Sequence, residues 1–301
     1  MRSSTTMAAA SIRPSVAAAG SAAFSASSGS GSGSGSGGYS TTHTSGSRGR
    51  NAASGGGSAS GTQAALHMLP LYLRRIVKWR QMDLEYTAWL MLQLCTNPKL
   101  AYRHTTYHKQ THNQWARDDP AFVVICSALV SFSATAYCIA FGYSVWHSLL
   151  TVLSAVVVDF LLLGVAIGTA GWLLSNKYLR ASVPGGHAHA VEQHVEWLYA
   201  FDVHCNAYFP LFLLLHVLQY FLLPLLLSGG FIGCLVSNAL YAVALAYYHY
   251  VTFLGYNALP FLEHTELFLY PIGVLALLAP LSLLSGFNPS VFVLRVYFGS
   301  S

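Results

Sequence analysis

Five long apolar stretches follow one another from residue 121 onward, and they dominate the hydropathy pattern of this chain. Each is about 20 residues or longer, which is the length that an α-helix needs to cross the hydrocarbon core of a bilayer. Because a backbone in lipid finds no water to bond with, each stretch should be helical. We therefore predict an all-α, polytopic membrane protein with five transmembrane helices, at about residues 121–141, 149–174, 208–227, 231–255 and 267–285.

The segment before the first span, residues 66–120, has a different pattern, in which apolar and basic residues are interleaved. Its apolar residues recur at helical spacing, and four bases lie between them: Arg74, Arg75, Lys78 and Arg80. This pattern is typical of a basic amphipathic helix in the headgroup layer of a membrane. The next apolar run, residues 84–94, is too short to span and should lie at the interface or against the bundle. We expect residues 66–120 to form basic juxtamembrane helices in the cytosol.

Ser, Gly and Ala dominate residues 1–65, including a Gly-Ser repeat. A segment of this composition buries little apolar surface, so we expect a disordered tail. The alternative is an organellar transit peptide, because the segment carries arginines and no acid precedes Asp83. At the other end of the chain, we expect residues 286–301 to form a short lumenal tail.

Composition and charge exclude an ordinary water-soluble domain. The chain is 54% hydrophobic and only 8% charged, whereas a typical soluble domain is about 25% charged. Twelve Lys and Arg residues precede the first span, and the second loop adds Lys177 and Arg180. The opposite side carries only Arg295. The positive-inside rule therefore places the N-terminus in the cytosol and the C-terminus in the lumen.

One acid, Asp159, lies in the middle of an apolar span, where a carboxylate is costly and is a functional candidate by default. His216 lies at a similar depth in the third span, so a contact between the two side chains could form a proton relay. The alternative is an interhelical hydrogen bond that fixes packing. We favour packing, because a coupled carrier usually has more intramembrane acids and because Gly164 and Gly168 form a small-residue face nearby.

A histidine-rich stretch precedes the third span, and its residue types could ligate zinc. No two of its histidines are four residues apart, however, which is the spacing that places two ligands on one helix face. The alternative is an interfacial helix with a titratable polar face. No Gly-rich phosphate loop or nucleophile elbow occurs in the chain. The candidate ligands are His187, His189, His194, His204, Glu192, Glu196 and Asp202.

The basic segment has three interpretations. It can contact anionic lipid headgroups, at about 1 kcal/mol for each base near the surface. It can dock an acidic cytosolic partner. It can bind RNA, since aromatic and basic residues are interleaved, although this pattern is weak. The candidate contact residues are Arg74, Arg75, Lys78, Arg80, Arg103 and Lys109.

Long and uncommon motifs run through residues 68–285. The longest reads LRRIVKWRQMDLEYTAWLMLQLCTNPKLAYRHTTYHKQT, and it is followed by NQWARDDPAF, VVVDF, SNKYL, VEWLYAFDVHCNAYFP and YNALPFLEHT. Together these motifs closely resemble the Unc-fifty family of five-span Golgi membrane proteins. The chain departs from the family in its long Ser/Gly tail and in the insert near His187.

The resemblance implies a role in secretory-pathway trafficking, including surface delivery of assembled receptors as membrane-protein cargo. It also implies association with an Arf guanine-nucleotide exchange factor, and it attributes RNA binding and an inner nuclear membrane pool to some members. It implies no catalysis and no cofactor. Several polar residues fall within the family motifs without an assigned chemical role: Asp159, Glu196, Trp197, Asp202, His204 and Asn206.

The sequence thus predicts a non-enzymatic Golgi protein that acts in vesicle trafficking. Its basic cytosolic segment and second loop would recruit partners. The alternative functions are a proton-coupled carrier that uses Asp159 and His216, and a metalloenzyme built on the second loop.

Overall fold

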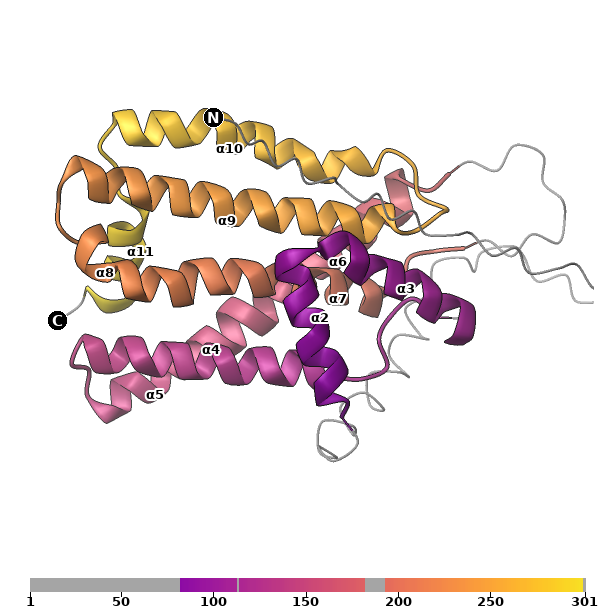
Figure 1. The fold of residues 1–301 in the computed structure, drawn as a ribbon, viewed down its shortest axis with the longest axis horizontal. Coiled ribbons are helices and arrows are strands. Elements are labelled where there is room, and N and C mark those ends of the chain that lie inside the picture. The colour runs from indigo at the N-terminus through magenta and orange to yellow at the C-terminus, as the bar shows by residue number, and fades with distance from the viewer. Residues whose placement is uncertain (1–81, 113, 182–192, 300–301) are drawn as a thin grey trace, which may run out of the picture. The chain divides into compact units, whose positions relative to one another are not determined.

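The computed structural model of this chain describes residues 82–112, 114–181 and 193–299, all of which belong to one compact unit. Its regular elements are helical, apart from one isolated bridge between Arg180 and Leu262. In Figure 1 the short helices α2 and α3 lie at one end of the helical bundle. The elements are α2 (Leu84–Thr96), α3 (Pro98–His112), α4 (Ala121–Ala140), α5 (Val145–Ser154), η2 (Ala155–Leu162), α6 (Leu163–Tyr178), α7 (Trp197–Phe212), η3 (Leu213–Leu218), α8 (Gln219–Leu226), α9 (Phe231–Asn257), η4 (Thr265–Leu269), α10 (Tyr270–Leu284) and α11 (Pro289–Phe298).

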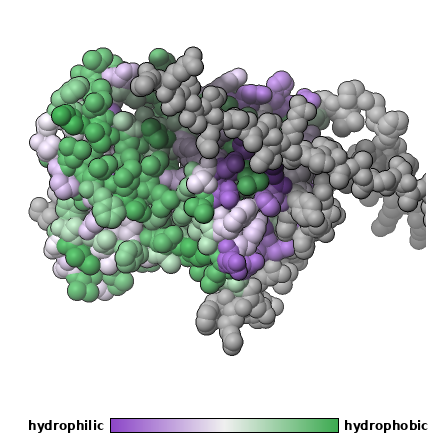
Figure 2. All heavy atoms as spheres, in the orientation of Figure 1, coloured by the Kyte–Doolittle hydropathy of each residue, from purple (hydrophilic) through white to green (hydrophobic). Residues whose placement is uncertain are grey.

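Five continuous helices are long and apolar enough to cross a membrane, which confirms the predicted fold class. Figure 2 shows hydrophobic residues over most of the bundle and hydrophilic residues near α2 and α3. This distribution is expected if the bundle lies in lipid and α2 and α3 lie at a membrane surface. The five helices run Ala121–Ala140, Val145–Tyr178, Trp197–Leu226, Phe231–Asn257 and Thr265–Leu284.

The third long helix begins at Trp197, whereas we expected its span to begin at residue 208. The polar residues between these two positions had indicated a loop. In the structure they are helical because the protein itself surrounds them, and Asp202, His204 and Asn206 are all buried. Polar groups inside a bundle need protein partners rather than water.

The chain after the fifth span, for which we expected a short lumenal tail over residues 286–301, contains a helix, α11. The Asn288 side chain accepts a hydrogen bond from the Val291 amide and so caps the helix. The Ser290 hydroxyl lies 2.8 Å from that of Ser237 in α9. The helix also carries Tyr297, whose hydroxyl lies near the Asp159 carboxylate of the second span. These contacts fix α11 against the bundle.

Helix α7 lies at the centre of the bundle. Every residue from Tyr199 to Pro210 is buried, and α7 packs against α2, α4, α6 and α9. Helix α10 differs from α7 in burial, because none of the residues of α10 is buried. An apolar helix without a buried face is stable only in lipid, so α10 is the outer helix of the bundle.

The approach of α6 to α7 depends on glycine. A Cβ atom at Gly168 would lie 3.1 Å from the Cα atom of Phe201, and one at Gly164 would lie 2.8 Å from the His204 ring. These distances confirm the close packing that the spacing of the two glycines predicted. By contrast, nothing lies within 4 Å of a Cβ atom at Gly273 in α10.

We expect Gly168→Leu to destabilise the protein by about 1–3 kcal/mol, because the backbone of α7 must move to admit the side chain. Gly273→Leu is the matched control and should leave stability unchanged. The measurement is the thermal unfolding midpoint of each purified variant in detergent. Equal midpoints for the two variants would show that α6 and α7 are not in close contact.

Candidate functional site

The loop between α3 and α4 folds against the beginning of α7, and this contact forms the main polar cluster at the α2–α3 end. We call loop residues 114–119, together with Glu196 and α7 residues 197–206, the junction. Glu196, directly before α7, accepts hydrogen bonds from the backbone amides of Trp115 at 3.2 Å and Ala116 at 3.0 Å. Trp115 and Ala116 are buried. The carboxylate therefore satisfies two amides that have no secondary-structure partner.

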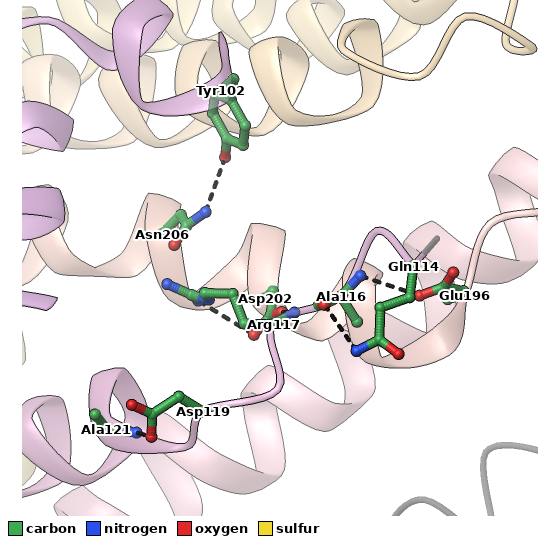
Figure 3. Close-up of polar contacts among 9 residues, drawn as sticks. All are labelled: Tyr102, Gln114, Ala116, Arg117, Asp119, Ala121, Glu196, Asp202 and Asn206. Carbon is green, nitrogen blue, oxygen red and sulfur yellow. Dashed lines mark hydrogen bonds and ion pairs between the residues drawn. The ribbon is translucent and has the colours of Figure 1, made fainter. Parts of the chain in front are cut away.

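An ion pair between Arg117 and Asp202 forms the centre of the junction (Figure 3). The Arg117 backbone amide lies 2.8 Å from Asp202 Oδ2, and its guanidinium Nη2 lies 3.1 Å from Oδ1. Asp202 is only 4% exposed. The guanidinium also covers the Phe122 ring, 4.4 Å from its centroid. One arginine thus binds α7 by backbone and side chain and contacts α4 as well.

Two further aspartates connect α2 to α4. Asp119 accepts the Ala121 amide at 3.0 Å through Oδ1 and the Asp83 amide at 2.8 Å through Oδ2. Asp83 in turn caps α2 by accepting the Tyr86 amide at 2.9 Å. Negative side chains at these two helix starts also suit the positive end of each helix dipole. The two short helices are therefore held to the membrane domain by polar contacts.

A cavity of about 230 Å³ lies between α2 and the junction. Its polar lining includes Asp83, Arg117, Asp119, Asp202 and Asn206, and its aromatic lining includes Tyr86 and Tyr199. The Asn206 amide nitrogen lies 3.5 Å from the Tyr102 hydroxyl of α3 (Figure 3). Burial raises the pKa of that Tyr102 hydroxyl above its usual value, so it is neutral at physiological pH.

The residues predicted to contact partners are placed as follows. Arg103 is exposed on α3. The Lys109 ammonium lies 5.6 Å from the centre of the Trp115 ring. The other four bases of this prediction, Arg74, Arg75, Lys78 and Arg80, lie outside the described residues.

The remaining motif residues of α7 face α6 and α9. The indole nitrogen of Trp197 donates to Thr169 Oγ1 at 3.0 Å, and its ring stacks on Phe201. The His204 Nδ1 lies 2.8 Å from the Tyr248 hydroxyl. These residues fix the packing of α7. They do not line the cavity that contains the Arg117–Asp202 ion pair.

Asp159 and His216 do not form the pair that a proton relay requires. The Tyr297 hydroxyl of α11 lies near the Asp159 carboxylate, while the His216 ring stacks on Phe212, 5.2 Å between centroids. No hydrogen bond joins Asp159 to His216 among the described residues, and Tyr297 of α11 lies beside the acid instead. The packing interpretation of Asp159 stays a prediction.

The predicted zinc ligands of the second loop lie partly outside the described residues, which exclude His187, His189 and Glu192. Among the residues that are described, no group of three or more His, Cys, Asp or Glu side chains could hold a metal ion. Glu196 and Asp202 instead bind the loop between α3 and α4.

Sequence reasoning missed Arg117 and the pairing of its loop with α7. The signal was present, because Arg117 lies within the motif NQWARDDPAF and Asp202 lies within VEWLYAFDVHCNAYFP. These two motifs are separated by two membrane spans, so their contact could be seen only in three dimensions.

Comparison with known proteins agrees with the motif resemblance. The model of the UNC-50 family matches residues 72–298. An unc-50 homologue of Dictyostelium discoideum is 52% identical over 233 residues, which cover 77% of this chain and 88% of the relative. The homologue of Homo sapiens is 45% identical over 218 residues, covering 72% and 82%. The homologue of Danio rerio is 43% identical over 220 residues, covering 72% and 83%. No solved structure gives a significant match.

We expect Arg117→Met to destabilise the protein by about 3–5 kcal/mol, because it leaves the Asp202 carboxylate buried without its counter-charge. Arg103→Met on the exposed face of α3 is the matched control and should change stability by less than about 0.5 kcal/mol. The measurement is the thermal unfolding midpoint in detergent.

A double variant tests the pairing itself. Adding Asp202→Asn to Arg117→Met should recover part of the lost stability, because an amide tolerates burial without a counter-charge. Purely additive losses would show that the two side chains are not coupled.

Proposed function

Because this chain belongs to the UNC-50 family, we propose that it is a non-enzymatic Golgi membrane protein that acts in vesicle trafficking and surface delivery of membrane-protein cargo. Its action would be to recruit an Arf guanine-nucleotide exchange factor to the membrane. The observation that carries this proposal is the junction, which holds α2 and α3 firmly at one end of a five-helix bundle. Such an arrangement presents a fixed surface to a partner rather than a loose tail.

The exposed charge on this surface suits an acidic partner. Lys99, Arg103 and His104 are exposed on α3, and no acid occurs between Glu85 and Asp118. Positive potential attracts acidic proteins and anionic lipid headgroups, and it raises the association rate. RNA would be attracted by the same charge.

The charge distribution also supports a cytosolic location for this end. Lys177, in the last turn of α6, and Arg180 lie at the same end as α2 and α3, since α6 runs toward the junction. Arg295 lies in α11, at the other end. The N-terminus would then be cytosolic and the C-terminus lumenal. A pool at the inner nuclear membrane would have the same orientation.

A basic-segment variant tests recruitment. Changing Arg74, Arg75, Lys78 and Arg80 together to Gln should remove several kcal/mol of attraction, at about 1 kcal/mol for each base. We expect normal insertion and stability, but loss of exchange-factor binding and of Golgi retention. The measurement is co-purification of the exchange factor from membranes at low and high salt, because electrostatic binding weakens as salt rises.

The matched control exchanges Lys and Arg at the same four positions, which keeps the charge. It should recruit the exchange factor as the native protein does. If the Gln variant recruits the factor normally at every salt concentration, the segment acts only as a topology signal and the recruitment proposal is wrong.

A second variant separates trafficking from the proton-carrier alternative. Asp159→Asn should retain trafficking activity, because an amide is still a polar group that can hydrogen-bond the nearby Tyr297 hydroxyl. Asp159→Leu is the comparison, and it should lose stability by about 1 kcal/mol because it leaves no polar group for that hydroxyl. The measurement is surface delivery of a reporter membrane protein. A stable, correctly located Asp159→Asn protein without activity would favour the carrier, since asparagine cannot titrate.

A further inference from the structure

A second cavity lies between α6 and α9, and its floor is α7, on which both helices pack. Its volume is about 200 Å³, which holds a side chain but not a further helix, since a helix is about 10–12 Å wide. On its open side, Ile167 of α6 is 37% exposed and Ala170 is exposed as well. We call this cavity the α6–α9 groove, and the lining residues that matter below are Ile167, Ala170, Gly171, His204, Tyr248 and Tyr256.

The floor of the groove carries a ring nitrogen without a partner. His204 is only 3% exposed, and its Nδ1 lies 2.8 Å from the Tyr248 hydroxyl. Its Nε2 is buried and has no hydrogen-bond partner among the described residues. In a neutral imidazole one nitrogen donates and the other accepts, so Nε2 can use a partner in either tautomer. Buried polar atoms are nearly always paired, and this one lacks a partner within the described chain.

The depth of His204 limits what can supply that partner. The His204 ring lies against Gly164, and the Tyr256 hydroxyl lies against Gly171. Seven residues of α6 separate the two glycines, which is about 10 Å along the helix. Tyr256 is in the last turn of α9 and Trp172 follows Gly171, and such rings favour the membrane interface. His204 therefore lies about 10 Å inside a hydrocarbon core about 30 Å thick, where lipid acyl chains have no donor or acceptor.

The outer face of α6 allows another helix to come close. Ala166 and Ala170 are both exposed and are four residues apart, so they share one face of α6. Small residues on a lipid-facing surface let the backbone of a second helix approach closely. Because Ala170 also lines the groove, a helix on this face can insert a side chain toward His204.

We infer that the α6–α9 groove binds a transmembrane helix of another membrane protein. That helix carries an amide or hydroxyl side chain about 10 Å inside the interface at the α2–α3 end. The side chain enters beside Ala170 and hydrogen-bonds His204 Nε2. An amide suits either tautomer of the ring, because it has both donors and acceptors. The inference rests on the proposed trafficking function in one respect, namely that the bound helix belongs to membrane-protein cargo.

The test uses synthetic transmembrane peptides and the purified full-length protein in lipid vesicles. The probe is a Leu/Ala helix of about 21 residues with one Asn placed about seven residues from one end. Two comparison peptides have Leu at that position, and one of them carries the Asn at its terminal residue instead. Binding is measured by resonance energy transfer between labelled protein and labelled peptide at low peptide-to-lipid ratios.

We expect the probe to bind about three- to tenfold more tightly than both comparison peptides, which is the range of an interhelical hydrogen bond in a membrane. If the native protein binds all three peptides equally, the inference is wrong and the groove contains lipid or water. If the terminal Asn works as well as the deep one, His204 is not the partner, which also contradicts the inference.

Variants locate the binding surface. Ala170→Phe fills the groove from its exposed side and should remove the preference for the probe. Ala276→Phe is the matched control, because Ala276 is exposed on α10 and does not line the groove. His204→Phe should bind the probe and the comparison peptides equally. If His204→Phe does not fold, the two alanine variants still decide, and a preference that persists in Ala170→Phe would show that the helix binds elsewhere.

The outcome is separable from that of the proposed function. Peptide binding in vesicles involves no exchange factor, so its failure leaves the recruitment experiment on the basic segment unaffected. Conversely, normal recruitment by the Gln variant of that segment would leave the peptide preference of the groove unchanged, and only its assignment to trafficking cargo would be lost.

Discussion

The structure depends on one buried ion pair, between Arg117 in a connecting loop and Asp202 in the central helix α7. Both charges lie largely out of water, so each is tolerable only because the other is present. The loop that carries Arg117 joins α3 to α4, and its amides also bind Glu196. The pair therefore does more than stabilise two side chains. It determines where α2, α3 and α4 begin relative to α7, and hence the shape of the cavity between them.

The central helix is unusual because its first half is both polar and buried. Asp202, His204 and Asn206 would be too costly in lipid, and each is enclosed by a different neighbour: the α3–α4 loop, α9 and α3. The short helices α2 and α3 are consequently part of the membrane domain. They cover polar residues of α7 that lipid would otherwise meet, and the exposed face of α3 carries Lys99, Arg103 and His104.

A similar principle operates at the opposite end of the bundle. There α11 folds back, and Ser290 and the capping residue Asn288 hydrogen-bond Ser237 of α9 and Leu226 at the end of α8. Asp159 lies in η2, a π-helical segment of the second span, where widened turns change the direction of side chains. The Tyr297 hydroxyl of α11 lies near this intramembrane acid. Polar contacts thus close both ends of a bundle whose outer surfaces are apolar.

The sequence by itself determined the all-α membrane fold class, the five long helices and the family. A long uncharged run can adopt few backbone structures in lipid, and the family motifs are long. It also predicted the glycine-mediated contact near Gly168, since small residues four apart share one helix face. It misplaced the beginning of α7, where polar residues looked like a loop, and it contained no prediction of the helix α11. Only the tertiary structure paired Arg117 with Asp202 and brought Tyr297 near Asp159. Hydropathy records whether a residue avoids water, but it contains no information about which distant side chain replaces that water.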